Sequence, residues 1–201
     1  HPERGDRRRA FVRKPTYTVG WDWGPKALTC GIVKGAYLRA YDKVALRGAH
    51  LRAERAAEGD ARLRVTLEID QLNVYATADA DIDIKLSLPG APDACAALRD
   101  VLLTSGINYV DFDLDVPGAK LWWPSGYGEQ PLYDVSIEVR SGGGLDQMTF
   151  PYGIHTVALD TSRTGPDARA FQLIVNSVPV FCKGGDWIPA DSIYARVTPE
   201  K

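Results

Sequence analysis

The sequence has little cysteine and none of the long apolar runs that mark a membrane span. Its 201 residues include three cysteines, Cys30, Cys95 and Cys182, without a CxxC spacing. An odd and dispersed set argues against a disulfide scaffold or a zinc site. It is typical of a reducing compartment, so we expect a cytoplasmic protein. No apolar run approaches the roughly 18 residues of a spanning helix, and there is no signal-peptide pattern, an absence that says little for a fragment.

An excess of one charge is also missing. The 24 Lys and Arg residues against 26 Asp and Glu residues give a formal net charge of -2. This balance provides no overall attraction to nucleic acid or to an anionic membrane, and we expect neither as a partner. The basic run RGDRRR at 4–9 is short and lacks aromatics, so we interpret it as a solvated end. The sequence has no GxSxG, HExxH or P-loop pattern, and we expect no cofactor and no metal.

The sequence does have a strong alternation of apolar and polar residues with a period of two. In VDFDLDV (110–116), four apolar residues alternate with three aspartates, and segments 63–69, 82–88 and 133–139 alternate in the same way. Each predicts a strand with one face in a core and one in water. Turn signals rich in Gly and Pro separate them. About seven short strands between residues 44 and 158 predict an all-β fold, a β-sandwich.

Three further segments carry local structure signals. Within the sandwich region, DACAALRD (93–100) is the only short candidate for a helix. Before the sandwich, YLRAYD (37–42) predicts a strand. After it, FQLIVN and VPVFCKG flank a turn at Asn176-Ser177 and predict a β-hairpin.

The C-terminal ARVTPEK is typical of a helix that is about to begin, with Thr198 as N-cap and Pro199 at the first helical position. A protein seldom ends on such a signal. We therefore infer that the sequence was cut from a longer one.

The five tryptophans gather in three stretches: Trp21 and Trp23 in TYTVGWDWGP, Trp122 and Trp123 in KLWWPSGYGEQPLY, and Trp187 in KGGDWIPAD. A sugar offers C–H faces to aromatic rings and vicinal hydroxyls to carboxylates, and a Trp-Asp-Trp loop closed by Gly-Pro supplies both partners. In an extended segment Trp21 and Trp23 share one face and Asp22 takes the other. The same residues also fit a structural turn whose aspartate caps nearby N–H groups.

The other two tryptophan stretches also allow two interpretations. LWWPSGYGEQPLY (121–133) lies between two strands as a sugar platform or as a packed loop that pins one domain on the next. Its Pro and Gly content favours packing. In KGGDWIPAD, Asp186 and Asp191 bracket Trp187 after a strand end, as residues do at the mouth of a βα barrel. An Asp-rich turn with Pro fits that segment equally well.

Two aspartate clusters and two histidines could be mistaken for metal or catalytic sites, but we interpret none of them as a site. DADID (79–83) and DFDLD (111–115) resemble cation sites, but carboxylates at i and i+2 on a strand form its wet face. Neither segment has the spaced ligands and turn glycine of a calcium loop. His155 is a lone histidine that we interpret as structural. Neither His155 nor His50 has a paired nucleophile.

Beside the β-sandwich, the tryptophan motifs resemble those of the β-mannosidases of glycoside hydrolase family 2. The similar stretches, in the family's order, are RKPTYTVGWDWGP, GIVKGAYLRAYD, LWWPSGYGEQPLYDVSIEV, GIHTVALDT and FQLIVNSVPVFCKGGDWIPADSIYARVTPE. They cover nearly the whole chain. The resemblance implies the C-terminal part of a sugar-binding-like jelly-roll domain at 1–43 and an immunoglobulin-like β-sandwich domain at 44–158. Residues 159–201 would be the opening hairpin and first strand of a catalytic (β/α)8 barrel, truncated.

The resemblance also implies which residues bind substrate. In similar enzymes the Trp-Asp-Trp loop leans over the barrel mouth. Its aspartate, here Asp22, contacts hydroxyls of the mannose ring, and its aromatic neighbours, here Trp21 and Trp23, shape the pocket wall. The end of the first barrel strand, here with Asp186 and Trp187, also faces the pocket.

The chain departs from the family pattern at three positions. Asp186 stands where the family usually has Asn, which replaces a neutral amide with a charge. His155 replaces a usual Arg, and Ser177 replaces a usual Gly. The last two changes do not touch the chemistry.

By the same resemblance, the chain contains no catalytic residue. A retaining glycosidase needs two carboxyl groups roughly 5–5.5 Å apart. In this family they are glutamates on later barrel strands, the acid/base following an Asn, and the chain has no Asn-Glu dipeptide. The parent enzyme would hydrolyse terminal non-reducing β-D-mannose residues with retention, through a glycosyl-enzyme intermediate. Its partners would be a β-mannoside or oligosaccharide substrate and the remaining jelly-roll and barrel domains of the same polypeptide.

Other functions stay open. The chain could be a stand-alone carbohydrate-binding module, although this needs a complete sandwich and a self-sufficient aromatic platform. It could also be a structural adaptor between domains. Within the enzyme interpretation, the related specificities of exo-β-glucosaminidase and β-galactosidase remain.

Overall fold

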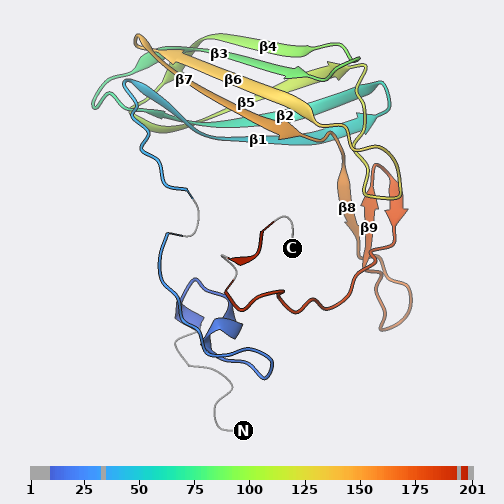
Figure 1. Ribbon diagram of the computed structural model, residues 1–201. Helices are drawn as coiled ribbons and strands as arrows, with labels where there is room; N and C mark the ends of the chain where they lie inside the picture. Colours follow the sequence, from blue (N-terminus) through green and yellow to red (C-terminus); the bar gives the residue numbers. More distant parts are fainter. Residues whose placement is uncertain (1–9, 33–34, 194–195, 199–201) are drawn as a thin grey trace. The chain divides into compact units, whose positions relative to one another are not determined.

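The computed structural model describes residues 10–32, 35–193 and 196–198. The chain forms two compact units: residues 1–39 together with 183–201, and Ala40–Cys182. The described residues contain ten strands, β1 to β10, and a short 3-10 helix, η2, at Thr16–Val19 (Figure 1). They form no helix with the length and hydrophobicity that a membrane crossing requires. The basic run at 4–9 and the helix start expected at Pro199 lie outside the described residues.

Two antiparallel sheets make up most of the unit Ala40–Cys182. A three-stranded sheet has the order β1-β2-β5, with strands Val44–Ala57, Asp60–Gln71 and Gly106–Pro117. A four-stranded sheet has the order β4-β3-β6-β7, with strands Ala94–Leu103, Ala78–Ser87, Tyr133–Ser141 and Gly144–Tyr152. Figure 1 shows the sheets stacked face to face. The expected all-β sandwich is confirmed, and its strands are longer than expected, at 9 to 14 residues.

The period of two decides which side chains are buried. On β2, Leu63 and Val65 are fully buried while Arg64 between them faces outward. The antiparallel register places Leu63 beside Leu114 of β5 and Val65 beside Phe112. Alternate residues of β3 and β6 complete the core from the opposite sheet: Ile82, Ile84, Leu86, Val135, Ile137 and Val139. Burial of one large apolar side chain stabilises a fold by about 1.5–3 kcal/mol.

A third, small sheet follows the sandwich in the order β10-β9-β8, with strands Val178–Val180, Gln172–Val175 and Val157–Asp160. Asn176 and Ser177 join β9 to β10 with φ values of 48° and 65°. A two-residue turn with both residues at positive φ matches the twist of a tight hairpin. The predicted hairpin is therefore confirmed.

Two local expectations are wrong. Residues 93–100 were expected to form a short helix, but residues 94–100 lie within β4, where Ala94 pairs with Leu86 of β3. Cross-strand pairing and burial of one face override the helix propensity of alanine. Residues 37–42, expected to form a strand, form none. No strand among the described residues pairs with this segment, and Leu38 is fully exposed.

Strand β4 is an edge strand, because in the described part of the chain it pairs with β3 alone. The regular pairing is interrupted by a shift of register between Ala80 and Ile82. Opposite this shift, Asp100 has a φ of 53°, and its N–H donates to the Asp81 carboxylate at 3.3 Å. A bulge of this kind bends the strand and increases its local twist.

At the opposite side of the sandwich, β1 and β7 are the edge strands of different sheets. The Leu46 N–H of β1 donates to the Asp146 carboxylate of β7 at 2.7 Å. Tyr152 of β7 hydrogen-bonds the backbone of Ala53 on β1. Burial raises the pKa of the Tyr152 phenol above its ordinary value, and the bond to Ala53 offsets only part of this rise. Side chains of β7 therefore satisfy backbone groups of β1 that would otherwise lack a partner.

Tyr133 fastens the end of the sandwich at which the chain leaves β5. Its ring is fully buried, and its phenol oxygen accepts a hydrogen bond from the Lys120 N–H at 2.9 Å. The same connection meets the β1–β2 turn, where the Gly59 N–H donates to the Ala119 carbonyl at 2.8 Å. This arrangement is similar to the tyrosine corner of immunoglobulin-like sandwiches.

Replacing Tyr133 with Phe tests this corner. Tyr133→Phe keeps the buried ring and leaves the Lys120 N–H without its acceptor, so we expect the free energy of unfolding to fall by about 1 kcal/mol. Urea denaturation followed by circular dichroism measures the change. Tyr75→Phe, at a fully exposed position, is the matched control and should change the free energy by less than about 0.5 kcal/mol. Equal losses in the two variants would contradict a role for the Tyr133 hydroxyl.

Candidate functional site

The Trp-Asp-Trp segment begins where η2 ends. The Thr18 hydroxyl donates to the Pro15 carbonyl at 2.8 Å, across the first turn of η2. Gly20 donates its N–H to the Tyr17 carbonyl at 3.0 Å and has a φ of 106°. Glycine adopts this φ without the steric cost that a Cβ imposes. Gly20 therefore ends η2 and redirects the chain into the next turn.

Reciprocal backbone hydrogen bonds close that turn. Trp21 and Gly24 each donate to the other's carbonyl, at 3.3 and 3.4 Å, so Asp22 and Trp23 lie between the two bonded residues. The segment is a reverse turn. It is not an extended segment, in which Trp21 and Trp23 would share one face and Asp22 would take the other. Within residues 10–32 and 35–193, no hydrogen bond or ion pair engages the Asp22 carboxylate. The backbone closes this turn, and the Asp22 carboxylate stays exposed.

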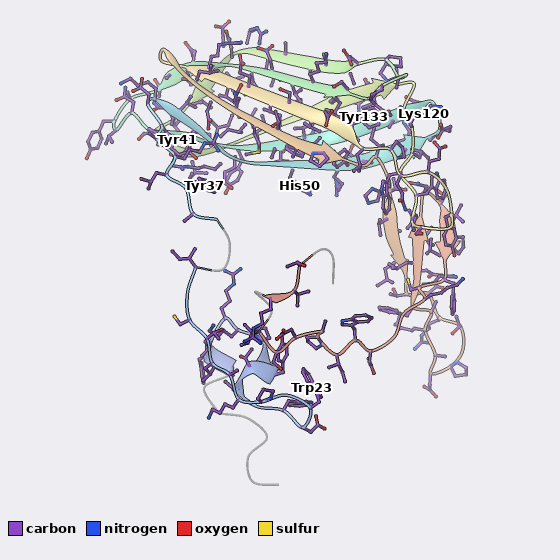
Figure 2. All side chains as sticks on the ribbon, viewed as in Figure 1. Trp23, Tyr37, Tyr41, His50, Lys120 and Tyr133 are labelled. Carbon is purple, nitrogen blue, oxygen red and sulfur yellow. The ribbon has the colours of Figure 1, made fainter. Side chains whose placement is uncertain are left out.

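The aromatic rings of the turn keep accessible faces. Trp21 is 42% exposed and Trp23 37%. The Trp23 ring packs on Tyr17, with 5.2 Å between ring centroids and 41° between ring planes; Figure 2 labels Trp23 on this loop. Sequence reasoning missed Tyr17, although it stands in the same short stretch. Half-exposed rings beside an exposed carboxylate can stack on a sugar and accept hydrogen bonds from its hydroxyls.

The KGGDWIPAD segment supplies the other expected site residues. Asp186 and Trp187 are both exposed, Trp187 by 84%. Asp191 acts locally, because its carboxylate accepts the Ile193 N–H at 2.9 Å. This is the Asx turn by which aspartate commonly redirects a loop. Asp191 is therefore engaged with the backbone, whereas Asp186 and Trp187 are free to meet a ligand or another part of the protein.

The two site segments belong to one unit, residues 1–39 with 183–201. Ser192, the residue after KGGDWIPAD, lies beside the turn: its Oγ is 3.8 Å from the position that a Cβ on Gly24 would occupy. Ser192 has no chemical signal in the sequence, so only the structure identifies this contact. In the described part of the unit, no hydrogen bond, ion pair or ring contact joins Asp186 or Trp187 to the turn.

The LWWPSGYGEQPLY loop is packed, as its composition favours. Trp123 packs against the sandwich core, and the Trp122 ring lies 5.2 Å from the His155 ring. A Cβ on Gly153 would come within 2.8 Å of the Trp122 ring, and one on Gly128 within 2.7 Å of the Trp123 ring. His155 Nδ1 also lies 2.8 Å from the Gly153 carbonyl oxygen. The tryptophans of the loop are thus packed, and these contacts support a structural role for His155. That the loop pins one domain on the next stays a prediction.

Two family models match the sequence. A model described as glycosyl hydrolase 2 galactose-binding domain-like matches residues 1–34. The model for glycosyl hydrolases family 2 matches residues 44–155, more than half of the chain. The chain belongs to glycosyl hydrolases family 2. The domain boundaries expected after residues 43 and 158 stay predictions.

Relatives of this family 2 chain include fungal proteins named β-mannosidase B. The chain is 32% identical to the protein from Emericella nidulans over 209 residues, 98% of this chain and 22% of that protein. It is also 32% identical to the protein from Thermothelomyces thermophilus over 196 residues, 96% of this chain and 22% of that protein. The chain thus spans about a fifth of the length of these relatives.

Solved structures show the same likeness. The β-D-mannosidase of Dictyoglomus thermophilum is 30% identical with a TM-score of 0.80, and the match covers 100% of this chain and 24% of that one. The exo-chitosanase of Amycolatopsis orientalis is 25% identical with a TM-score of 0.59, covering 80% of this chain and 18% of that one. The resemblance noted in the sequence is therefore confirmed.

The aspartate-rich strand β5 of this family 2 chain faces arginines. Asp113 accepts hydrogen bonds from Arg62 at 2.6 Å and from Arg64 at 3.1 Å. Asp111 accepts one from the Thr66 hydroxyl at 2.5 Å. No group of three or more His, Cys, Asp or Glu side chains among the described residues could hold a metal ion. The alternating aspartates form a charged ladder across the sheet surface.

Asp83 of β3 also pairs with two arginines. It accepts hydrogen bonds from Arg99 at 2.6 Å and from Arg140 at 3.0 Å. The bond from Arg99 is the main reason that the pKa of Asp83 lies below its ordinary value; partial burial opposes this effect and Arg140 reinforces it. Ionised Asp83 therefore favours the folded chain.

This lowered pKa sets the direction of a pH dependence. A carboxyl whose pKa is lower in the folded chain stabilises it above the unfolded pKa of about 4 and loses this effect as the pH falls through the folded value. We expect Asp83→Asn to lower the urea midpoint at pH 6 and to approach the wild-type midpoint at pH 3. Asp167→Asn is the control, because Asp167 is exposed and has no ion pair among the described residues. A deficit of Asp83→Asn that is the same at both pH values would contradict the expectation.

Proposed function

We propose that this chain is part of a retaining exo-β-mannosidase that removes terminal non-reducing β-D-mannose residues. The observation that carries the proposal is the likeness to a β-D-mannosidase over 100% of the chain, at a TM-score of 0.80. The chain would supply scaffold and part of the substrate-pocket wall. Its substrate would be a β-mannoside or an oligosaccharide, and its partners would be the remaining domains of the same polypeptide. A cytoplasmic location stays a prediction from the cysteine pattern.

The pocket-wall role rests on the exposed groups of the unit that contains residues 21–23 and 186–187. Trp21, Trp23 and Trp187 present accessible rings, and rings of this kind stack on the C–H face of a sugar. Asp22 presents an exposed carboxylate, which can accept hydrogen bonds from two vicinal hydroxyls. Asp186 would add a second charge where the family usually has an amide.

The chemistry itself would come from residues outside this chain. Retention needs a nucleophile and an acid/base roughly 5–5.5 Å apart. In the family both are glutamates, the acid/base after an Asn, and no Asn-Glu dipeptide occurs here. The isolated chain would therefore bind sugar at most and would not hydrolyse it.

A related specificity is the second candidate. The exo-chitosanase likeness, at 25% identity over 80% of the chain, favours a glucosaminide as the competing substrate. The β-mannosidase likeness has the higher identity and the fuller coverage. A stand-alone binding module and a structural adaptor are the remaining alternatives, and mannose affinity of the isolated chain would exclude the adaptor.

Hydrolysis of a chromogenic aryl β-mannoside tests the proposal. We expect turnover by the full-length protein that contains this chain and none by the 201-residue chain, because the catalytic pair is outside it. The intact mass of each sample is the control for identity, and an aryl β-glucosaminide compares the two specificities. Turnover by the 201-residue chain that survives repurification would refute the domain assignment. Preference of the full-length protein for the glucosaminide would refute the mannosidase proposal.

Replacing Asp22 tests the pocket wall. A hydrogen bond to a charged group contributes about 1.5–3 kcal/mol, so Asp22→Ala should lower kcat/KM of the full-length protein for the aryl β-mannoside about 10- to 100-fold. Asp167→Ala, at an exposed position, should leave kcat/KM unchanged. Wild-type kcat/KM in Asp22→Ala would show that this carboxylate does not contact the sugar.

A further inference from the structure

The hairpin formed by β8 and β9 extends beyond the ends of these two strands. Asp160 of β8 pairs with Gln172 of β9, and Arg163 forms a further antiparallel bridge with Arg169. Arg163 is three residues after Asp160 and Arg169 is three residues before Gln172, so the bridge keeps the register of the strands. Figure 1 shows this connection between β8 and β9. Residues 161–171 (the finger) therefore continue the hairpin and are not an irregular loop.

The backbone of the finger brings its two arginines close together. The Thr164 N–H donates to the Ala168 carbonyl at 3.0 Å, and the Ala170 N–H donates to the Ser162 carbonyl at 2.8 Å. These bonds lie on either side of the two arginines, which is the pattern of a non-hydrogen-bonded antiparallel pair. The α-carbons of such a pair are about 4.5 Å apart, and the two side chains leave the same face of the hairpin. The guanidiniums can therefore reach the same ligand.

These two positive charges have no acidic partner in the described part of the chain. Arg163 and Arg169 are both exposed, and no ion pair of either falls among the described residues. Asp160, at the base of the finger, accepts the Ser162 N–H at 2.8 Å, and Asp167, near its tip, is exposed. Like charges directly opposite each other on neighbouring strands destabilise their pairing. The finger thus contains a repulsion that a bound anion would relieve.

One of the guanidiniums is already oriented by the backbone. Arg169 Nη1 donates to the Thr161 carbonyl at 3.2 Å. Thr161 lies on the side of the hairpin that carries Arg163, so this bond ties the Arg169 guanidinium to the opposite side. A guanidinium offers several N–H donors in a planar fork, and this bond uses only one of them. The remaining donors of Arg169 and those of Arg163 are available to a ligand.

We propose that Arg163 and Arg169 together bind one phosphate group, either on a phosphorylated sugar or as free phosphate. A phosphate monoester carries a charge of about −1.5 to −2 at about pH 7, which matches two guanidiniums, whereas a carboxylate matches only one. Guanidinium forks bind phosphate oxygens bidentately. The site lies wholly within the unit Ala40–Cys182, and it does not depend on the mannosidase function proposed above.

Single substitutions test each arginine separately. Arg163→Gln and Arg169→Gln each remove one guanidinium and keep a long polar side chain at an exposed position. Each should raise the Kd for phosphate at least about tenfold, because hydrogen bonds to a charged group are lost. Arg52→Gln is the matched control: it removes an exposed arginine of β1, changes the net charge equally and should leave the Kd unchanged.

Hydrogen exchange of residues 161–171, followed by mass spectrometry on the full-length protein, measures binding at the finger itself. Inorganic phosphate is titrated while sodium chloride keeps the ionic strength constant, and circular dichroism shows that every variant is folded. At a phosphate concentration of about ten times the Kd, we expect exchange in the wild type to slow about tenfold, because binding opposes local opening by mass action. At that concentration the two finger variants should show much less slowing than the wild type and Arg52→Gln.

Mannose 6-phosphate, mannose and acetate complete the experiment. Tighter binding of mannose 6-phosphate than of inorganic phosphate assigns the site to a phosphorylated sugar, and equal or weaker binding assigns it to free phosphate. Mannose and acetate should leave exchange in the finger unchanged.

Three results would overturn the proposal: no slowing of wild-type exchange by phosphate, a wild-type Kd in either finger variant, or an effect of acetate or mannose as large as that of its phosphate-bearing counterpart. None of these results depends on β-mannosidase activity, so failure of the proposed function and failure of the phosphate site are distinguishable.

Discussion

The exclusion of water from between the two sheets is the constraint on which the rest of the sandwich depends. The inner faces are apolar, but a sandwich has open sides where backbone groups of edge strands would remain unpaired. At the side formed by β1 and β7, Asp146 and Tyr152 satisfy the backbone of Leu46 and Ala53. A buried donor without a partner costs about 1–3 kcal/mol. Asp146 and Tyr152 therefore supply hydrogen-bond partners at the edge of the apolar core, and the Tyr152 ring also packs against that core.

This constraint also divides the tryptophans into two kinds. Trp122 and Trp123 are packed so closely that only glycine fits beside them. Trp21, Trp23 and Trp187 are exposed, although exposing so large an apolar ring to water is unfavourable. Packing explains the first pair completely. Under the function proposed above, a sugar would cover the exposed three.

Much of the fold could be predicted because burial on one face imposes a period of two, which is visible in VDFDLDV and its three companions. The failure at residues 93–100 has a physical cause: alanine favours a helix locally, and only pairing of residues 94–98 with residues 82–86 of β3 makes the segment a strand. For the site, residue types identified the Trp-Asp-Trp loop. Its reverse-turn geometry depends on Gly20 and on bonds between Trp21 and Gly24, which residue types do not encode.

The bulge on β4 has a consequence for the protein in concentrated solution. An uninterrupted edge strand offers a row of free N–H and C=O groups to which a strand of another molecule can add. Asp100, at a φ of 53°, breaks that row and places a carboxylate in it. A second chain that approached this edge would meet a bend in place of a template, and a negative charge in place of an acceptor pattern. The same local irregularity that complicates the register of the sheet thus opposes edge-to-edge aggregation.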